Sequence, residues 1–262
     1  MSAGGDPDAP RDSSLSIRLF LSGRELTAYL ARTDSLPPDI AIVIDVLRAS
    51  TTLVYAFENG AARARAFGTP EEAVAAREGD PDALLCGERG GLKIPGYDLG
   101  NSPSEYTRDV VAGRTLFMTT TNGTLALART AAAGLQLLAA YVNLRAVARR
   151  VATLAAAGAR AGRSPEIWIV AAGKEDEESE EDTACARELE RRLMTGEVAA
   201  EAGSADPALE AFLAHTEHGR MLLALEPRFA ADLRAAARRD ALSAVPEGRG
   251  GVLSRASGVV PE

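Results

Sequence analysis

The chain is poor in the residues that build soft metal centres. It contains two cysteines and two histidines in 262 residues. Cys86 and Cys185 lie far apart and show no metal-type spacing, and such free thiols are typical of a reducing cytosol. This shortage argues against a cysteine-based metal site and against a disulfide framework.

Basic residues are in short supply as well. The chain has 29 Lys and Arg against 37 Asp and Glu, which gives a formal net charge of −8. Binding nucleic acid requires a dense basic face, so a nucleic-acid partner is excluded. An anionic substrate requires a local pocket whose charge opposes the overall field.

Long apolar runs are also missing. No run reaches the length that crosses a membrane, so we expect no membrane partner. The first fourteen residues, MSAGGDPDAPRDSS, are polar and acidic and lack the apolar core of a signal peptide. We expect a disordered N-terminus over residues 1–14 and a cytoplasmic protein.

Aromatic residues make up 5% of the chain, so the core must be aliphatic. Short apolar runs alternate with helical patterns, which predicts an α/β fold with a largely parallel or mixed sheet. From about Asp206 helices dominate until a short strand in LSAVP. We expect residues 15–262 to form one domain with a helical C-terminal part and one soft boundary near 202–207. The predicted strands cover residues 39–47, 83–87, 114–120, 135–142 and 165–173.

Helix-start signals follow several of these strands. Ser50 or Thr51 is expected to cap a helix that ends at Gly60. Ser102, with Pro103 at the first helical position and Glu105 three residues on, has the pattern of a capping box. Each of these hydroxyls, taken alone, is explained by capping.

Polar residues gather where the predicted strands end. Because ligands of open α/β sheets bind outside the carboxyl ends of the strands, these residues are expected to share one crevice. Asp45 interrupts an apolar strand, where an unpaired charge costs several kcal/mol. Arg48 is its candidate ion-pair partner, so a salt bridge and an active site explain this pair equally well. The residues at the four strand ends are Asp45, Arg48, Ser50 and Thr51, then Glu88, then Thr119 to Gly123, and finally Glu180, Glu181 and Asp182.

This mixture of side chains suits phosphoryl chemistry. Hydroxyls, helix-start N–H groups and an arginine hold phosphate oxygens, and carboxylates without histidine or paired cysteines suit Mg²⁺. Other phosphate signatures are absent: there is no G-x-x-x-x-G-K-[ST], and Leu47 and Leu92 stand where two phosphatase classes require Asp and Arg. His215 and His218 lie in the helical tail without an Arg-His-Gly signature, which argues against a histidine phosphatase.

The glycine-rich stretch from Gly87 to Thr107 is too long for an ordinary connection. It is either a binding loop or a disordered insertion. Ile94, Tyr97 and Leu99 have the character of anchors that pack it down, so we predict a binding loop whose backbone N–H groups approach an anion.

Three motifs in this order, IDVLRASTT, GERGGLKIPGYDLGNSPSEY and TTTNGT, strongly resemble those of the 2-phosphosulfolactate phosphatase family. The resemblance is close from Ile42 to Leu125 and continues less clearly toward the C-terminus. It implies a three-layer α/β/α fold and a Mg²⁺-dependent phosphatase that converts (R)-2-phospho-3-sulfolactate to 3-sulfolactate and phosphate. In methanogens that step belongs to coenzyme M synthesis.

The resemblance also implies which positions form the site, while the roles follow from residue chemistry. This chain departs from the family at the fourth motif, where KEDEESE precedes Glu181 and Asp182. The predicted catalytic residues are Asp45, Arg48 and Glu88; the predicted substrate-binding residues are Ser50, Thr51, Asn101, Ser102, Thr120, Thr121, Asn122 and Gly123; the predicted Mg²⁺ ligands are Asp45, Glu181 and Asp182.

Two other functions remain open at this point. A non-catalytic protein that binds a small phosphorylated metabolite would keep the phosphate cradle without a working metal site. An interaction protein would use every motif as a cap or turn, which requires four coincidences. A homodimer is compatible with the chain, because dimers are the commonest closed assembly. Attack by Asp45 and attack by a metal-activated water are both compatible with these residue types.

Overall fold

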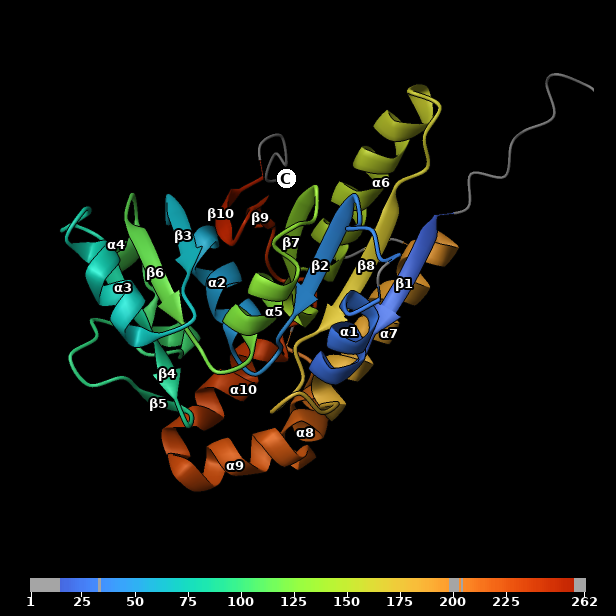
Figure 1. The fold of residues 1–262 in the computed structure, drawn as a ribbon. Coiled ribbons are helices and arrows are strands. Elements are labelled where there is room, and N and C mark those ends of the chain that lie inside the picture. The colour runs from blue at the N-terminus through green and yellow to red at the C-terminus, as the bar shows by residue number, and fades with distance from the viewer. Residues whose placement is uncertain (1–14, 33, 198–202, 204, 257–262) are drawn as a thin grey trace, which may run out of the picture.

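A computed structural model describes residues 15–32, 34–197, 203 and 205–256. Its centre is a mixed, largely parallel sheet with the strand order β1-β8-β2-β7-β9-β10-β3-β6-β4-β5. One parallel block contains β1, β8, β2 and β7, and a second contains β3, β6 and β4. The antiparallel hairpin β9–β10 joins the two blocks (Figure 1). The strands are β1 Ser16–Phe20, β2 Ile40–Ile44, β3 Arg63–Ala66, β4 Leu84–Arg89, β5 Leu92–Lys93, β6 Thr115–Thr119, β7 Leu135–Ala139, β8 Glu166–Ala171, β9 Pro246–Arg249 and β10 Val252–Arg255.

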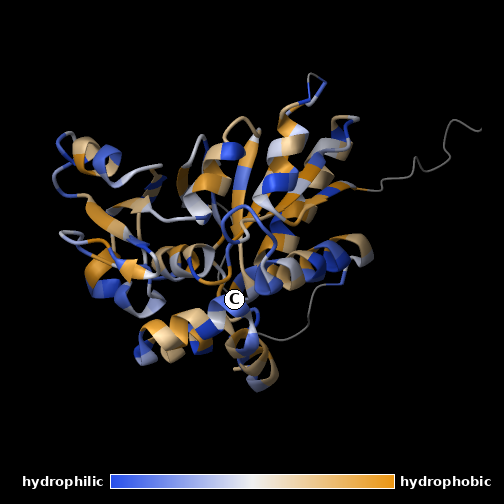
Figure 2. Ribbon diagram, turned by 60° about the horizontal axis from the view of Figure 1, so that its bottom comes forward, coloured by the Kyte–Doolittle hydropathy of each residue, from blue (hydrophilic) through white to orange (hydrophobic). Residues whose placement is uncertain are grey.

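Helices cover both faces of this sheet, as a fully buried parallel strand requires. Alternate residues of β2 belong to different cores, because successive side chains of a strand point to opposite faces. Val43 packs in a cluster with residues of α1, α2 and α5, whereas Ile42 and Ile44 pack in a cluster with residues of α6 and α7. Figure 2 shows the apolar strands enclosed between the helices. The predicted three-layer α/β/α fold is therefore confirmed. The α-helices are α1 Gly23–Leu30, α2 Ala49–Glu58, α3 Pro70–Arg77, α4 Arg108–Val111, α5 Gly123–Arg129, α6 Leu144–Arg160, α7 Glu180–Thr195, α8 Pro207–His215, α9 Glu217–Leu225 and α10 Ala230–Ala236.

The C-terminal part, from α8 to α10, packs on the face that α6 and α7 cover. Leu213, Leu222 and Leu233 belong to the same hydrophobic cluster as Ile42 and Ile44 of β2. The helical character predicted for this part is confirmed, but the chain then returns to the sheet. The strand expected in LSAVP begins only at its last residue, as part of the β9–β10 hairpin. The predicted disordered segment 1–14 lies outside the described residues, as do residues 202 and 204 of the boundary 202–207.

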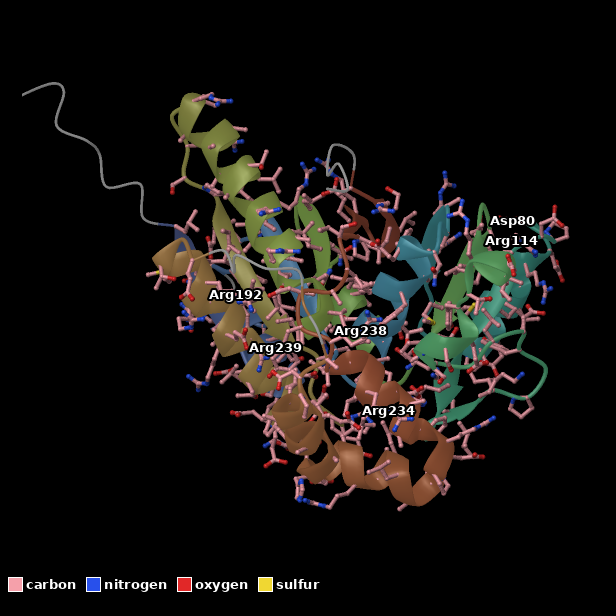
Figure 3. The ribbon with its side chains drawn as sticks, turned by 180° about the vertical axis from the view of Figure 1, so that it is seen from behind. Asp80, Arg114, Arg192, Arg234, Arg238 and Arg239 are labelled. Carbon is pink, nitrogen blue, oxygen red and sulfur yellow. The ribbon has the colours of Figure 1, made fainter. Side chains whose placement is uncertain are left out.

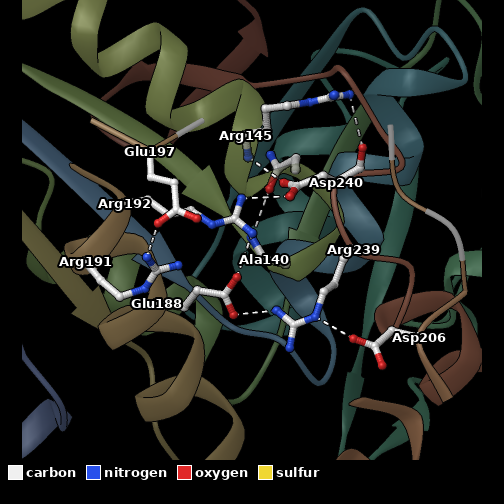
Figure 4. A network of polar contacts seen from close by, with 10 residues as sticks. Ala140, Arg145, Glu188, Arg191, Arg192, Glu197, Asp206, Arg239 and Asp240 are labelled. Carbon is white, nitrogen blue, oxygen red and sulfur yellow. Dashed lines mark hydrogen bonds and ion pairs between the residues drawn. The ribbon is translucent and has the colours of Figure 1, made fainter. Parts of the chain in front are cut away.

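A network of buried and partly buried ion pairs fixes this part to α7. Arg192 of α7 bonds to Asp240 at 2.7 Å and to Glu188 at 2.6 Å. Arg239 pairs with Glu188 and reaches Asp206 at 2.6 Å (Figure 4). Seen from behind, Arg192 and Arg239 lie close together where α7 meets the C-terminal segment, far from Arg114 beside β6 (Figure 3). The network therefore joins two elements that are distant in the sequence.

Two helix-start predictions are wrong. Neither Ser50 nor Thr51 caps α2: Arg48 occupies the cap position, and the first free N–H, that of Ala49, goes to the Asp45 carboxylate at 3.0 Å. The capping box at Ser102 does not form either. Only a 3₁₀ turn follows, at Pro103–Glu105, and the Ser102 hydroxyl makes no cap bond.

Within the described residues, no helix combines the length and the apolar character needed to cross a membrane.

Candidate functional site

A pocket of about 260 Å³ lies between the carboxyl ends of β2, β4 and β6 and helix α9. Its wall includes six of the residues predicted from the sequence. It also includes several that the sequence did not indicate, which are described below. The predicted residues on the wall are Asp45, Arg48, Glu88, Asn101, Thr121 and Asn122.

Asp45 follows directly after β2 and is 6% exposed. Two hydroxyls shape the turn that holds it. Ser50 Oγ accepts the Asp45 N–H at 3.1 Å, and Thr51 Oγ1 donates to the Val46 carbonyl at 2.7 Å. Ser50 and Thr51 are buried and are not on the pocket wall. They act on the pocket through the position of Asp45.

Burial raises the pKa of Asp45 to about 6. The Coulomb field of His218 and the N–H of Ala49 favour the charged form and oppose the rise, whereas Glu88 and Glu181 add to it. At neutral pH Asp45 is therefore mostly ionised, but its pKa lies within reach of a proton-transfer or nucleophilic role.

Asp182 and Glu181 come from the first turn of α7 and are both buried. Asp182 accepts the N–H of Val46 at 2.7 Å and the N–H of Gly173 at 3.1 Å. Burial raises the pKa of Asp182 well above its usual range, and the charges of Asp45 and Glu181 raise it further. Asp182 thus joins the segments that follow β2 and β8, and the three carboxylates repel one another.

Glu181 is 1% exposed and only half satisfied. Its Oε1 lies 3.2 Å from Nδ1 of His218, which is on the pocket wall. Its Oε2 has no hydrogen-bond partner among the described residues. A buried carboxylate oxygen without a partner is costly, so this atom is a good candidate for a ligand to a cation or for a bond to water.

Glu88 links the two loops on the other side of the pocket. Its Oε2 accepts the N–H of Gly91 at 2.8 Å, and its Oε1 accepts the N–H of Thr121 at 2.8 Å. Because both carboxylate oxygens hold backbone groups, Glu88 fixes the pocket wall as well as lining it. In the structure, the predicted catalytic residue Glu88 therefore positions the Gly91 and Thr121 loops.

Arg48 lies on the wall and is 4% exposed. Its carboxylate partner is Asp232 of α10 at 2.7 Å, rather than Asp45 as one interpretation of the sequence held. The guanidinium also stacks on Phe229, 4.2 Å from the ring centre. The Ser102 hydroxyl donates to the same Asp232, so Ser102 helps to fix the carboxylate that holds Arg48.

The remaining predicted residues divide between the wall and the interior. Asn122 Oδ1 accepts the N–H of Glu175 at 3.2 Å, and Asn101 has a buried Oδ1 with no partner among the described residues. Thr120 Oγ1 instead accepts the N–H of Thr124 at 3.1 Å, inside the start of α5. Gly123 is required by close packing, because a Cβ there would lie 2.6 Å from Asp45 Oδ2.

The glycine-rich stretch is packed down as predicted. Ile94 and Tyr97 are buried against Leu85 and Phe117, and Leu99 is buried in the main core. The stretch is not one loop, since it contains the β4–β5 hairpin, whose tip reaches α9: a Cβ on Gly91 would meet Leu225 at 2.8 Å.

Sequence reasoning missed four residues of the wall: Lys174, Glu175, His218 and Met221. Lys174 and Glu175 lie in the loop just after β8, where the strand-end rule applies most strongly, whereas the predicted Glu181 and Asp182 lie in the first turn of α7 and are not on the wall. His218 lies in the helical tail, where no sequence signal links it to the strand ends. Only the fold brings α9 over the strand ends.

The geometry therefore defines an α/β protein with a charged pocket for a small polar ligand at its strand ends. Residues 26–251 match the 2-phosphosulpholactate phosphatase family. Three relatives each carry the name "Probable 2-phosphosulfolactate phosphatase". That of Synechococcus sp. strain CC9605 is 42% identical over 228 residues, which cover 80% of this chain and 89% of the relative. That of Synechococcus sp. strain RCC307 is 38% identical over 240 residues, which cover 84% and 94%. That of Deinococcus radiodurans is 53% identical over 147 residues, which cover 54% of this chain and 58% of the relative.

The chain belongs to the 2-phosphosulpholactate phosphatase family, a family of phosphoric monoester hydrolases. The resemblance drawn from the three motifs is confirmed.

Proposed function

We propose that the protein is a Mg²⁺-dependent phosphatase that hydrolyses (R)-2-phospho-3-sulfolactate, or a closely related small phosphoester, to 3-sulfolactate and phosphate. The observation that carries this proposal is Asp45: a buried carboxylate on the pocket wall, at the end of a parallel strand, with Arg48 and His218 on the same wall. The names of the relatives support the choice of substrate. The cytoplasmic location and a homodimer stay predictions.

The donor chemistry suits Mg²⁺, although the described residues hold no group of three or more carboxylate, histidine or cysteine side chains around one point, so the protein would supply few of the ligands. The candidate donors are hard carboxylate oxygens, and the Oε2 atom of Glu181 is buried without a partner. Asp45 and Glu181 would hold the ion. Asp182 would keep the segments after β2 and β8 in place, because its two oxygens accept the N–H groups of Val46 and Gly173. Bound Mg²⁺ would neutralise the charge of the phosphate and relieve the repulsion among the carboxylates.

The chain's own groups supply the rest of the reaction. The Arg48 guanidinium and the backbone at the start of α5 would orient the phosphate, since such donors match its oxygens. Asp45 would act in its ionised form, either by attacking phosphorus or by taking a proton from the attacking water. Glu88 would hold the Gly91 and Thr121 loops against the phosphate, because its carboxylate joins them.

Phosphate release from (R)-2-phospho-3-sulfolactate tests this proposal. We expect turnover with Mg²⁺ or Mn²⁺, none after EDTA treatment, and recovery when Mg²⁺ is returned but not with Zn²⁺. Full turnover after exhaustive chelation would contradict the metal dependence. Tight binding of the substrate without turnover in Mg²⁺ would identify a binding protein instead.

A further inference from the structure

The basic side chains on the pocket wall differ in whether a carboxylate of the protein lies next to them. Three of them have such a partner close by, and any attraction to a ligand must compete with it. The three contacts are Arg48 with Asp232 at 2.7 Å, Lys174 with Glu217 at 2.6 Å and His218 with Glu181 at 3.2 Å.

Arg89 is different. Within the described part of the chain no carboxylate pairs with it. Its Nη1 donates to the Glu88 carbonyl at 2.9 Å and its Nη2 to the Gly68 carbonyl at 3.2 Å. Carbonyls hold the guanidinium in place but do not neutralise it, and a guanidinium has further N–H donors to offer. Arg89 therefore presents an oriented, uncompensated positive charge.

The position of Arg89 on the wall suggests which part of a ligand it meets. Asp45 and Arg48 are buried, so they form the floor, whereas Arg89 is exposed at the end of β4 and lies at the mouth. A phosphate held at the floor would leave the rest of a small substrate directed toward the mouth. The pocket volume of about 260 Å³ is enough for a three-carbon ester with two more anionic groups.

We infer that Arg89 is a specificity-determining residue that selects phosphomonoesters carrying a second strong anion, a sulfonate or a carboxylate. It takes no part in the chemical step. The inference rests on the proposed function only in that it assigns the phosphate to the floor of the pocket. A guanidinium fork suits either anion, because both present coplanar or near-coplanar oxygen pairs.

The test compares the unaltered protein with Arg89→Gln on three esters: (R)-2-phospho-3-sulfolactate, 2-phospholactate and phenyl phosphate. For the sulfonated ester we expect kcat/KM to fall by about 10- to 100-fold, the range for a lost charge-assisted hydrogen bond, mainly through KM. Phenyl phosphate, which has no second anion, should be hydrolysed as before. A similar loss on 2-phospholactate assigns the contact to the carboxylate, and a loss on the sulfonated ester alone assigns it to the sulfonate.

Two further variants make the comparison sharper. Lys93→Gln removes the same charge from the same hairpin, but Lys93 is not on the pocket wall. It should leave all three esters unaffected. Arg89→Lys keeps the charge and loses the fork, so it should recover part of the selectivity.

Binding provides a readout that does not depend on turnover. By isothermal titration, Arg89→Gln should weaken the affinity for 3-sulfolactate and leave that for inorganic phosphate unchanged. Equal losses on all three esters, no loss on any, or the same pattern from Lys93→Gln would overturn the inference. If the unaltered protein releases phosphate from none of the esters, the proposed function fails, and the binding of 3-sulfolactate still decides the role of Arg89.

Discussion

Helix α7 contributes to two clusters of charged side chains, one built from pairs of opposite charge and one from carboxylates that lie close together. Its first turn places Glu181 and Asp182 behind the pocket wall, next to Asp45 and His218, and further along the same helix Glu188 and Arg192 belong to the ion-pair network. In the network, opposite charges alternate, and the Leu209 N–H together with the Arg239 guanidinium holds the pKa of Asp206 below its usual range.

At the pocket and just behind its wall, like charges lie close to one another. Burial and mutual repulsion raise the pKa values of Asp45 and Asp182, and a buried oxygen of Glu181 has no partner among the described residues. Structural ion pairs also perturb pKa values, so perturbation alone does not mark a site. The direction of the pKa shifts separates the two cases: the network favours the charged forms of its members, whereas the surroundings of Asp45 and Asp182 favour the neutral carboxyl.

The largest effect is expected from breaking the network. Arg192→Met would leave Asp240 buried without its arginine and would remove one of the two arginines that pair with the partly buried Glu188, so the free energy of unfolding should fall by about 3–5 kcal/mol. Chemical denaturation with urea measures this. Arg191→Met is the matched control, because Arg191 is exposed and its pair with Glu197 contributes little. Equal losses in the two variants would show that the network does not carry the stability that we assign to it.

The second prediction breaks the pocket cluster at Asp45. Asp45→Asn keeps the shape and the bond from Ala49, but it removes the nucleophile or base and a Mg²⁺ ligand. Turnover should fall by about two orders of magnitude or more, while folding stays intact. Phosphate release and thermal melting on one preparation decide it. A variant that melts early yet keeps its specific activity would make Asp45 a structural residue.

The clusters also show what the sequence could and could not predict. Asp45 was found because a charge at the end of an apolar strand is conspicuous, and the strand-end rule placed Glu88, Thr121 and Asn122 beside it. His218 and Asp232 were not found, because they lie in helices whose position over the strand ends depends on packing at long range.

Parts of the fold were missed for a similar reason. Strands β1 and β3 carry polar or charged residues at alternate positions, and β10 has two apolar residues followed by two polar ones, so the apolar signal of all three is weak. Their existence depends on pairing with strands far away in the chain. By contrast, β2 and β8 are buried on both faces and were read directly from their apolar runs.

The third prediction concerns pH and the metal-free protein. The pKa of Asp45 is about 6 in the folded state against 3.8 for the free side chain, so its contribution to stability is complete below pH 3.8 and is lost as the pH rises through about 6. Asn does not titrate. In EDTA, the stability advantage of Asp45→Asn should therefore be small near pH 3.5, reach about half of its full size near pH 5 and approach about 3 kcal/mol at pH 8. An advantage that does not change with pH would contradict the assignment.

The smallest effects should separate two neighbours at the end of β6. Asn122 is on the pocket wall, whereas the Thr120 hydroxyl accepts the N–H of Thr124 inside the start of α5. Asn122→Ala should raise KM several-fold, on the order of one lost hydrogen bond, with little change in melting temperature. Thr120→Val should do the reverse: it should cost about 1 kcal/mol of stability, as the loss of a helix-start hydroxyl does, and leave KM unchanged. Steady-state kinetics and thermal melting on both variants measure the two quantities. If Thr120→Val raised KM as much as Asn122→Ala does, the hydroxyl would have to leave its bond to Thr124 and contact the substrate. The division between wall and interior at this strand end would then be wrong.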